Sequence, residues 1–285
     1  MKARALVALA ACVLLLAGPH AAPAQEAPTR IISLVPAATE MLYAIGAGPR
    51  VVAVSSYDHF PPAVEKLPRV GALLDPDLER ILSLRPDLVV IYGSQSDLNR
   101  QLSAAGIGVF GFVHGGIADA FTTIEQLGAR TGDEASATAL VTRLKDQLQQ
   151  VRARVAGEPR PHTLLIFDRT PFALRGLLAS GGIGFLNDEL EAAGGDNVFA
   201  DVKRESLPVS TEMVIARRPD VIIELHYGSP MSAADLARDR DSWNVLSAVP
   251  AVQHHRVYVL FGNDLVSAGP RLAEATERLA RVLHP

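Results

Sequence analysis

One pattern of residues occurs twice in this chain and limits the folds that the chain can adopt. It is Glu79-Arg-Ile-Leu-Ser-Leu-Arg-Pro-Asp87 in the first half and Glu212-Met-Val-Ile-Ala-Arg-Arg-Pro-Asp220 in the second. Each copy ends at Pro-Asp and continues into a β-branched run, at 88–91 and at 221–223. Because proline removes a backbone donor and biases the preceding residue away from helix, each copy predicts a helix, a stop and a buried parallel strand. Two such units predict two similar lobes with a cleft between them.

Strands and helices are expected to alternate around both copies. The expected strands are 31–35, 51–54, 88–91, 108–113, 163–167, 221–223 and 257–261, and the expected helices include 38–45, 98–105, 184–193 and 271–283. Continuously apolar strands that alternate with helices are typical of parallel sheets covered on both faces. The fold class is therefore expected to be α/β, with two Rossmann-like lobes that have mainly parallel sheets.

A different kind of segment separates the two halves. Residues 118–156 carry leucines and valines at helical spacing, with one break near Gly132-Asp133. The part from 134 to 155 is about 22 residues, or roughly 33 Å of helix. We therefore expect an N-terminal lobe at 25–117 and a C-terminal lobe at 157–285, joined through this linker by one long rigid helix. A stiff connection predicts only a small closure motion.

The first residues, 1–24, are typical of an export signal. Lys2 and Arg4 precede an apolar run, and Ala22-Pro-Ala24 offers small residues for cleavage before Gln25. The run has roughly 13 residues where a membrane span needs about 20, so a signal peptide is favoured over an anchor. Leu-Ala-Ala-Cys12 also fits a lipoprotein cleavage box, so a lipid anchor at Cys12 is the alternative.

Composition and motifs exclude several function classes. Cys12 is the only cysteine, so a chain cut before Gln25 has no thiol nucleophile, thiolate metal site or iron–sulfur cluster. The 27 basic residues face 31 acidic ones without forming a basic run, and a nucleic-acid partner is not expected. There is no Gly-x-Ser-x-Gly elbow or His-x-x-x-His pair, and the run Gly181-Gly-Ile-Gly184 does not directly follow a predicted strand. An enzyme is therefore not expected.

The loops after the predicted strands carry the candidate ligand-binding residues, because ligands of open parallel sheets bind beyond the carboxyl ends of the strands. Aromatic residues are only 5% of the chain, yet Tyr57, Phe60, Tyr92, Phe172 and Tyr227 all fall in these loops. The polar candidates there are Asp58, His59, His114, Asp168, Arg169, Arg175, His226, Asn263 and Asp264. Large planar apolar walls with a few polar groups suit a flat macrocycle such as a corrin.

With these residues in place, the chain resembles the periplasmic substrate-binding proteins of ABC importers, in the helical-backbone class (class III) that carries vitamin B12, ferric siderophores and haem. The resemblance rests on Arg30 to Glu40, Ser55-Ser-Tyr57 through Phe60-Pro-Pro62, Leu78-Glu-Arg80 with Pro86-Asp87, and Ser267-Ala-Gly-Pro-Arg271. The Ser-Ser-Tyr-x-x-Phe-Pro-Pro segment is most similar to the vitamin B12 binders. The resemblance implies a periplasmic monomer that binds cobalamin without a cofactor or covalent chemistry.

The resemblance also gives the repeated glutamates a role. In this class one surface glutamate of each lobe docks against arginines of the membrane permease, and Glu79 and Glu212 match those positions. One carboxylate on each lobe, at matching positions of the repeat, suits a two-fold permease that presents its own basic groups symmetrically. Each glutamate alone has a simpler explanation, because an acidic residue in a first helical turn meets the helix dipole favourably, by about 0.3–1 kcal/mol.

By resemblance, Tyr57, Tyr92 and Phe172 match aromatic positions of the vitamin B12 cleft, and Asn263 matches a polar contact. The expected ligand site comprises Tyr57, Phe60, Tyr92, Phe172, Arg175, Tyr227, Asn263 and Asp264. The chain departs from the vitamin B12 proteins at two of their tryptophans, where it has Leu73-Leu74 and Leu207-Pro208, and its only tryptophan is Trp243.

Because these two aromatic walls are missing, ligands other than cobalamin are also considered. Arg169 and Arg175 would suit an anionic ferric siderophore. Haem iron would find phenolate ligands in Tyr57 or Tyr92 and imidazole ligands in His59 or His226. A free-metal binder would need His59, His114 and His226 to converge, and a secreted hydrolase is the remaining alternative.

Overall fold

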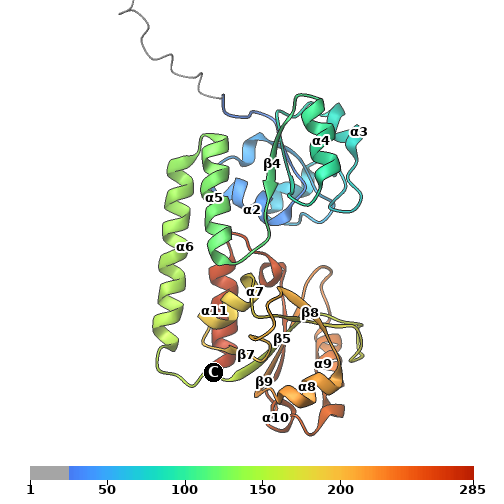
Figure 1. Ribbon diagram of the computed structural model, residues 1–285, viewed down its shortest axis with the longest axis vertical. Coiled ribbons are helices and arrows are strands. Elements are labelled where there is room, and N and C mark those ends of the chain that lie inside the picture. The colour runs from blue at the N-terminus through green and yellow to red at the C-terminus, as the bar shows by residue number, and fades with distance from the viewer. Residues whose placement is uncertain (1–25) are drawn as a thin grey trace, which may run out of the picture.

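The computed structural model describes residues 26–285 and contains two β-sheets, one in each lobe, joined by helices (Figure 1). The expected signal peptide and Cys12 lie outside these residues. In the part of the chain that is described, no helix is long and apolar enough to cross a membrane. The α/β class with two lobes, expected from the sequence, is confirmed.

The N-terminal lobe is built on a parallel sheet with the strand order β2-β1-β3-β4. Its elements are β1 (Ile31–Ser33), α2 (Pro36–Ala44), η1 (Gly48–Arg50), β2 (Val51–Val54), η2 (Pro62–Lys66), α3 (Leu78–Ser83), β3 (Leu88–Tyr92), α4 (Ser96–Ala104) and β4 (Gly108–Phe112). Ile31 and Ile32 are fully buried in different apolar clusters. Because successive side chains of a strand point to opposite faces, the sheet is covered on both sides, as its continuously apolar strands predict.

Two helices connect the lobes, α5 (Ile117–Thr131) and α6 (Glu134–Val155). They lie side by side along one edge of the molecule, and α6 extends beyond α5 to lie beside α11 of the C-terminal lobe (Figure 1). The chain turns between them at Gly132, whose φ of 77° is favourable only for glycine. Leu140, Leu144 and Leu148 of α6 are buried at helical spacing. The long helix expected from the sequence is present with the expected bounds.

The C-terminal lobe has a mixed sheet with the order β10-β9-β5-β6-β8, and β7 pairs with β5. Its strands are β5 (His162–Asp168), β6 (Leu177–Ser180), β7 (Asp196–Asn197), β8 (Ser206–Val209), β9 (Val221–His226) and β10 (Val257–Phe261). Its helices are α7 (Phe185–Ala192), α8 (Thr211–Arg217), α9 (Ala233–Asp241), η3 (Ser242–Leu246), α10 (Pro250–Gln253), η4 (Asn263–Val266) and α11 (Leu272–Leu283).

Strands β6, β7 and β8 have no counterpart in the sequence-based expectation. The parallel strands β5, β9 and β10 agree with it, whereas β6 and β8 run antiparallel at one edge of the sheet. They are short, and β8 contains Pro208, which breaks the apolar pattern. Proline is tolerated there because an edge strand leaves backbone groups without a ladder partner.

The repeated pattern folds into the same local structure in both lobes. Asp77 caps helix α3, because its side chain accepts a hydrogen bond from a backbone N–H of the first turn, and Ser210 does the same for α8. Arg85 and Arg218 then adopt left-handed φ values of 48° and 49°. A residue before proline cannot readily continue a helix, so α3 ends at Ser83 and α8 at Arg217, within one position of each other in the repeat.

The aspartate of each Pro-Asp pair forms a hydrogen bond with the start of the neighbouring strand. Asp87 accepts a hydrogen bond of 3.0 Å from the backbone N–H of Arg30, at the start of β1. Asp220 accepts one of 3.1 Å from the N–H of His162, at the start of β5. The two copies therefore place β3 and β9 identically beside β1 and β5.

Candidate functional site

A hollow of about 380 Å³ lies between the two lobes, and we call it the cleft. Strand ends of both sheets surround it, with Val35 after β1, Tyr57 after β2, Tyr92 at the end of β3, Phe112 at the end of β4, Tyr227 after β9 and Asn263 after β10. Its size falls within the range typical of small-molecule sites. The carboxyl ends of parallel strands are also the place where such sheets bind ligands.

A second hollow of about 340 Å³ adjoins the cleft on the side of the C-terminal lobe. The two hollows share His114, Tyr227 and Val266. Phe167 and Phe185 add further apolar surface to the second hollow. A ligand larger than either hollow would therefore span both.

Aromatic side chains form a continuous wall from one lobe to the other. The rings of Tyr92 and Phe112 meet edge to face at 6.0 Å, Phe112 meets His114 at 6.2 Å, and His114 meets Phe185 at 5.6 Å. Edge-to-face contacts fix the orientation of each ring. The ring contacts thus continue from β3 and β4 of the N-terminal lobe to α7 of the C-terminal lobe.

Five residues of the expected ligand site line the cleft, namely Tyr57, Phe60, Tyr92, Tyr227 and Asn263. The rings of Tyr57, Phe60 and Tyr227 are all exposed and line the same hollow, and such grouped apolar surface is typical of a ligand-binding groove. The Asn263 side chain accepts a hydrogen bond of 2.7 Å from the N–H of Gly228 and thereby holds the loop after β9.

Three residues of the expected site, Phe172, Arg175 and Asp264, lie outside the linings of both hollows. The Phe172 ring is covered by the guanidinium of Arg238, at 4.4 Å from the ring centroid. The carboxylate of Asp264 bonds Arg278 at 2.7 Å. Asp264 is thereby engaged within its own lobe.

Glu40 and Arg271 line the cleft although neither belongs to the expected site. Arg271 donates to the Glu40 carboxylate through Nε at 2.9 Å and through Nη2 at 2.7 Å. Burial raises the pKa of Glu40, and Arg271 opposes that rise. Both residues stand at the ends of the segments that carry the family resemblance, which was the only signal in the sequence that could have found them.

Two histidines of the lining also lie beside carboxylates, whereas the buried Ser267 hydroxyl has no hydrogen-bond partner among the described residues. His59 lies 3.1 Å from Glu65, and His114 lies 3.1 Å from Glu205. Burial, together with the charge of Asp58, raises the pKa of Tyr92, so its neutral phenol form is favoured. The one arginine of the lining is the bidentate partner of Glu40. The cleft therefore presents mainly apolar surface to a ligand, and the one arginine in its lining is paired with a carboxylate.

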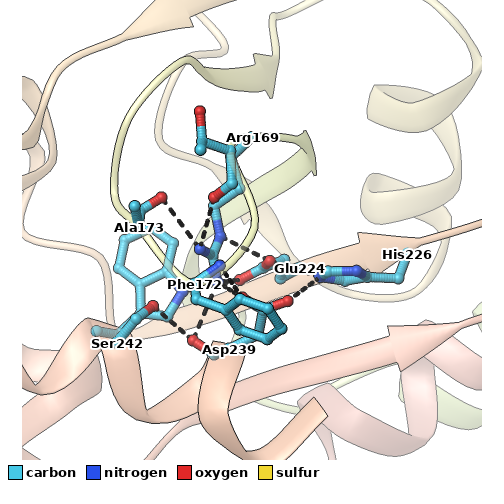
Figure 2. A network of polar contacts seen from close by, with 9 residues as sticks. Arg169, Phe172, Ala173, Glu224, His226, Asp239 and Ser242 are labelled. Carbon is cyan, nitrogen blue, oxygen red and sulfur yellow. Dashed lines mark hydrogen bonds and ion pairs between the residues drawn. The ribbon is translucent and has the colours of Figure 1, made fainter. Parts of the chain in front are cut away.

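Arg169 does not reach the cleft but forms the centre of a buried ion-pair network (Figure 2). Its Nε and Nη2 atoms lie 2.7 and 3.0 Å from the two oxygens of Glu224, and Nη2 lies 3.0 Å from a carboxylate oxygen of Asp239. The side chains of Arg169 and Glu224 are each only 2% exposed. The guanidinium that the sequence offered to an anionic ligand is thus committed to the protein interior.

Further donors complete this network. The Trp243 indole N–H donates to Glu224 at 2.9 Å, and His226 lies 2.6 Å from the same carboxylate. Burial favours the neutral form of Glu224, but the hydrogen bonds from His226, Arg169 and Trp243 outweigh it and hold the pKa of Glu224 below its ordinary value. The only tryptophan is fully buried here and provides no wall for the cleft.

The three histidines considered for metal binding, His59, His114 and His226, form no group of metal ligands with one another within residues 26–285. Among residues 26–285, the one group of three potential metal ligands is Glu224, His226 and Asp239. Because Arg169 already bonds both carboxylates, we interpret this group as part of the ion-pair network and not as a metal centre.

A larger hollow, of about 880 Å³, lies at the other end of the C-terminal lobe. Pro161, Asp220 and Arg256 line it at the amino ends of β5, β9 and β10. Two of its arginines, Arg154 and Arg160, are paired with carboxylates. It lies away from the strand ends where this type of sheet binds ligands, so size alone does not make it the candidate site.

The two repeated glutamates are exposed in the first turns of α3 and α8. Three residues after each glutamate, an apolar side chain is also exposed, Leu82 to 38% and Ile215 to 45%. Positions three apart lie on the same helix face. Each lobe therefore presents one carboxylate beside one apolar group at the same point of the repeat.

The sequence is similar to those of periplasmic and other substrate-binding proteins. The family model described as periplasmic binding protein matches residues 31–262. A vitamin B12-binding protein of Salmonella typhimurium is 32% identical over 259 residues, which cover 90% of this chain and 91% of that protein. An ABC transporter substrate-binding lipoprotein of Bacillus subtilis, YvrC, is 30% identical over 267 residues, covering 92% of this chain and 82% of that protein.

Solved structures of similar proteins include binders of two different macrocycles. The periplasmic vitamin B12 binding protein of Vibrio cholerae has a TM-score of 0.77 at 25% identity, covering 91% of this chain and 98% of that one. A periplasmic haem-binding protein, RhuT from a Roseiflexus species, has a TM-score of 0.75 at 26% identity, with the same two coverages.

Proposed function

Because the chain belongs to the periplasmic binding protein family, as the substrate-binding component of an ABC importer, we propose that its ligand is cobalamin or a related corrinoid. The family assignment confirms the resemblance inferred from the sequence. It also agrees with the expectation of a binding protein rather than an enzyme, since these relatives are substrate-binding proteins.

The observation that carries this proposal is the chemistry of the cleft. Its walls are aromatic, from Tyr57, Phe60, Tyr92, Phe112 and Tyr227. A large macrocycle without strong net charge buries apolar surface against such walls and needs few polar contacts. The engagement of Arg271 by Glu40 supports a ligand that requires no guanidinium partner.

A ferric siderophore is supported less well. Catecholate and carboxylate siderophores are anionic and are held by arginines. Arg169 is buried in its network, and Arg175 lies outside the cleft lining. An anion placed in the cleft would therefore lose its hydration without gaining a charged partner.

Haem is the second candidate, because Tyr57, Tyr92 and His59 all line the cleft and are possible iron ligands. The raised pKa of Tyr92 works against a phenolate at that position in the empty protein. Haem also carries two propionates, for which Arg271 is the one arginine of the lining. These features favour a corrinoid over haem.

The test is a calorimetric titration of the purified mature protein with cyanocobalamin, haemin, and one catecholate and one carboxylate ferric siderophore. We expect saturable one-to-one binding of cyanocobalamin, with an affinity at least about tenfold above that for the other ligands. Haemin that binds more tightly, with a shift of its Soret band, would replace cobalamin by haem as the ligand.

The importer's membrane permease is proposed to bind the faces that carry Glu79 and Glu212. Each face joins a carboxylate to an exposed apolar side chain, Leu82 or Ile215. Because the two faces have the same local structure, they suit a permease whose two halves offer matching basic and apolar groups.

Uptake measurements test this partner site separately from the ligand. Replacing Glu79 and Glu212 together with alanine is expected to abolish uptake of labelled cobalamin while leaving the Kd unchanged. The matched control replaces Glu125 and Glu134, two exposed glutamates of α5 and α6, and should retain uptake. A large loss of ligand affinity in the first double variant would place the glutamates in the binding site instead.

Residues 1–24 are proposed to direct export to the periplasm and to be removed before Gln25. The relative YvrC is described as a lipoprotein, so lipid attachment at Cys12 is the competing outcome. Mass spectrometry of the exported protein separates the two, because the first gives a chain that starts at Gln25 and the second a lipid-modified Cys12.

A further inference from the structure

Glu40 and Arg271 stand far apart in the sequence and come from different lobes. Glu40 lies on α2 of the N-terminal lobe, and Arg271 directly precedes α11 of the C-terminal lobe. They form a bidentate ion pair, with side chains exposed to only 6% and 19%. Arginine matches a carboxylate in this two-bonded geometry, which fixes both side chains more firmly than one bond would.

The same guanidinium contacts an aromatic wall of the cleft. Its central carbon lies 4.1 Å from the centroid of the Phe60 ring, a stacking distance. The planar guanidinium can stack on a ring and bond a carboxylate at the same time, whereas a lysine ammonium offers only a point charge. Phe60 follows β2 of the N-terminal lobe, so Arg271 makes two separate contacts across the lobes.

The backbone around Arg271 supports this arrangement. A Cβ placed on Gly269 would lie 3.3 Å from Oε2 of Glu40, so the turn before Arg271 passes close to the carboxylate. The charges that act on Arg271 come from Glu40, Asp264 and Glu274. Of these, Glu40 is the one that bonds it directly, and Asp264 bonds Arg278.

We propose that Arg271 is a positioning residue of the ligand site: it fastens the C-terminal lobe to the N-terminal lobe and holds the Phe60 ring as a fixed wall for the ligand. This proposal rests on the proposed function of the cleft. A wall that is already fixed in the empty protein loses less side-chain freedom on binding, and this raises affinity. Arg271 acts on the ligand through Phe60 and keeps its own charge paired with Glu40.

The experiment measures the Kd for cyanocobalamin in the mature protein and in Arg271→Lys, Phe60→Leu and the double variant. Arg271→Lys keeps the charge but loses the stacked, two-bonded geometry, and we expect affinity to fall about tenfold. If Arg271 acts through Phe60, the same substitution in the Phe60→Leu protein should change the Kd by less than about twofold.

Arg154→Lys is the matched control. Arg154 forms a similar bidentate pair with Glu277, between α6 and α11, and lies outside the cleft lining. We expect its Kd to equal that of the unchanged protein. Near-UV circular dichroism of each variant shows whether the packed structure is retained, and Arg271→Gln provides a second variant if Arg271→Lys does not fold.

Two results would overturn the proposal. One is an unchanged Kd in a folded Arg271→Lys or Arg271→Gln protein. The other is additive losses in the double variant, which would mean that Arg271 acts independently of Phe60. If the unchanged protein does not bind cyanocobalamin, the proposed ligand is wrong, and the same set of variants is measured with the ligand of the panel that binds.

Discussion

The two lobes carry the same repeated unit but bury different chemistry at the same position of it. Four residues after its Pro-Asp aspartate, β3 has Ile91 and β9 has Glu224, and both are almost fully buried. Ile91 packs in an apolar cluster, whereas Glu224 holds Arg169, His226 and Trp243. The repeat therefore specifies the backbone and leaves the interior free to differ between the lobes.

The consequences of this difference extend to the cleft. In the C-terminal lobe the network fixes the loop after β5, because Asp239 accepts a hydrogen bond of 2.6 Å from the N–H of Phe172 (Figure 2). His226, a member of the network, directly precedes Tyr227 of the cleft. A buried network depends on every partner, while an apolar cluster loses only what one side chain contributes. The lobes should therefore respond differently to substitution.

The largest expected effect comes from breaking the network at its only arginine. Arg169→Met leaves Glu224 and Asp239 buried without their cation, and we expect a loss of about 3–5 kcal/mol in the free energy of unfolding. Ile91→Val, the matched change in the N-terminal lobe, should cost about 0.5–1.5 kcal/mol. Urea denaturation measures the free energy of unfolding of both variants. Equal losses would show that the ion-pair network contributes no more to stability than the apolar cluster does.

Ligand binding provides the next comparison, with one tyrosine from each lobe. Tyr92→Ala and Tyr227→Ala are each expected to weaken cyanocobalamin binding about tenfold to a hundredfold, because each ring supplies a wall of the cleft. Tyr92→Phe keeps the wall and should bind nearly as well as the unchanged protein. A large loss in Tyr92→Phe would instead indicate that the phenol oxygen is required, as for an iron ligand.

A third comparison uses a buried carboxyl that is confined to the C-terminal lobe. Glu189 on α7 is fully buried, and neither of its carboxyl oxygens has a hydrogen-bond partner within residues 26–285, so burial raises the pKa of Glu189 well above its ordinary value of 4.5. The folded protein thus keeps a proton that the unfolded chain releases, and its stability falls as pH rises above about 4.5.

Glu189→Gln removes this pH dependence because the amide does not ionise. The variant should therefore gain stability relative to the unchanged protein at pH 7, and the gain should shrink to nothing as the pH falls below about 4. Thermal unfolding across that pH range measures it. A gain that is independent of pH would mean that ionisation of Glu189 is not the cause.

The smallest expected effect concerns the helix caps, where the two lobes have the same local structure. Asp77→Ala and Ser210→Ala remove the capping side chains of α3 and α8, and each should cost about 1 kcal/mol of stability. Chemical denaturation should give similar values for the two, since both caps accept the same bond at the same point of the repeat. Clearly unequal losses would show that the copies are not energetically equivalent.

The sequence predicted the parts of the site that depend on local pattern. Tyr57 and Tyr227 follow apolar strands and Tyr92 ends one, and parallel strands bring their carboxyl ends together. It did not predict that Phe112 and His114 continue the aromatic wall to Phe185, because that contact joins two lobes. It also gave no sign that Arg169 is buried, since an arginine after a strand is usually exposed.

The sequence by itself determined the repeat, the α/β alternation and the bounds of α6, because helical and strand periodicity are local properties of the chain. Only the tertiary structure decided which charged groups meet. Arg271 could pair with Asp264 or Glu274, which are close in the sequence, and instead it bonds Glu40 at a separation of 231 residues. The choice of partner follows from where the two lobes bring the chain together, and no local pattern records that.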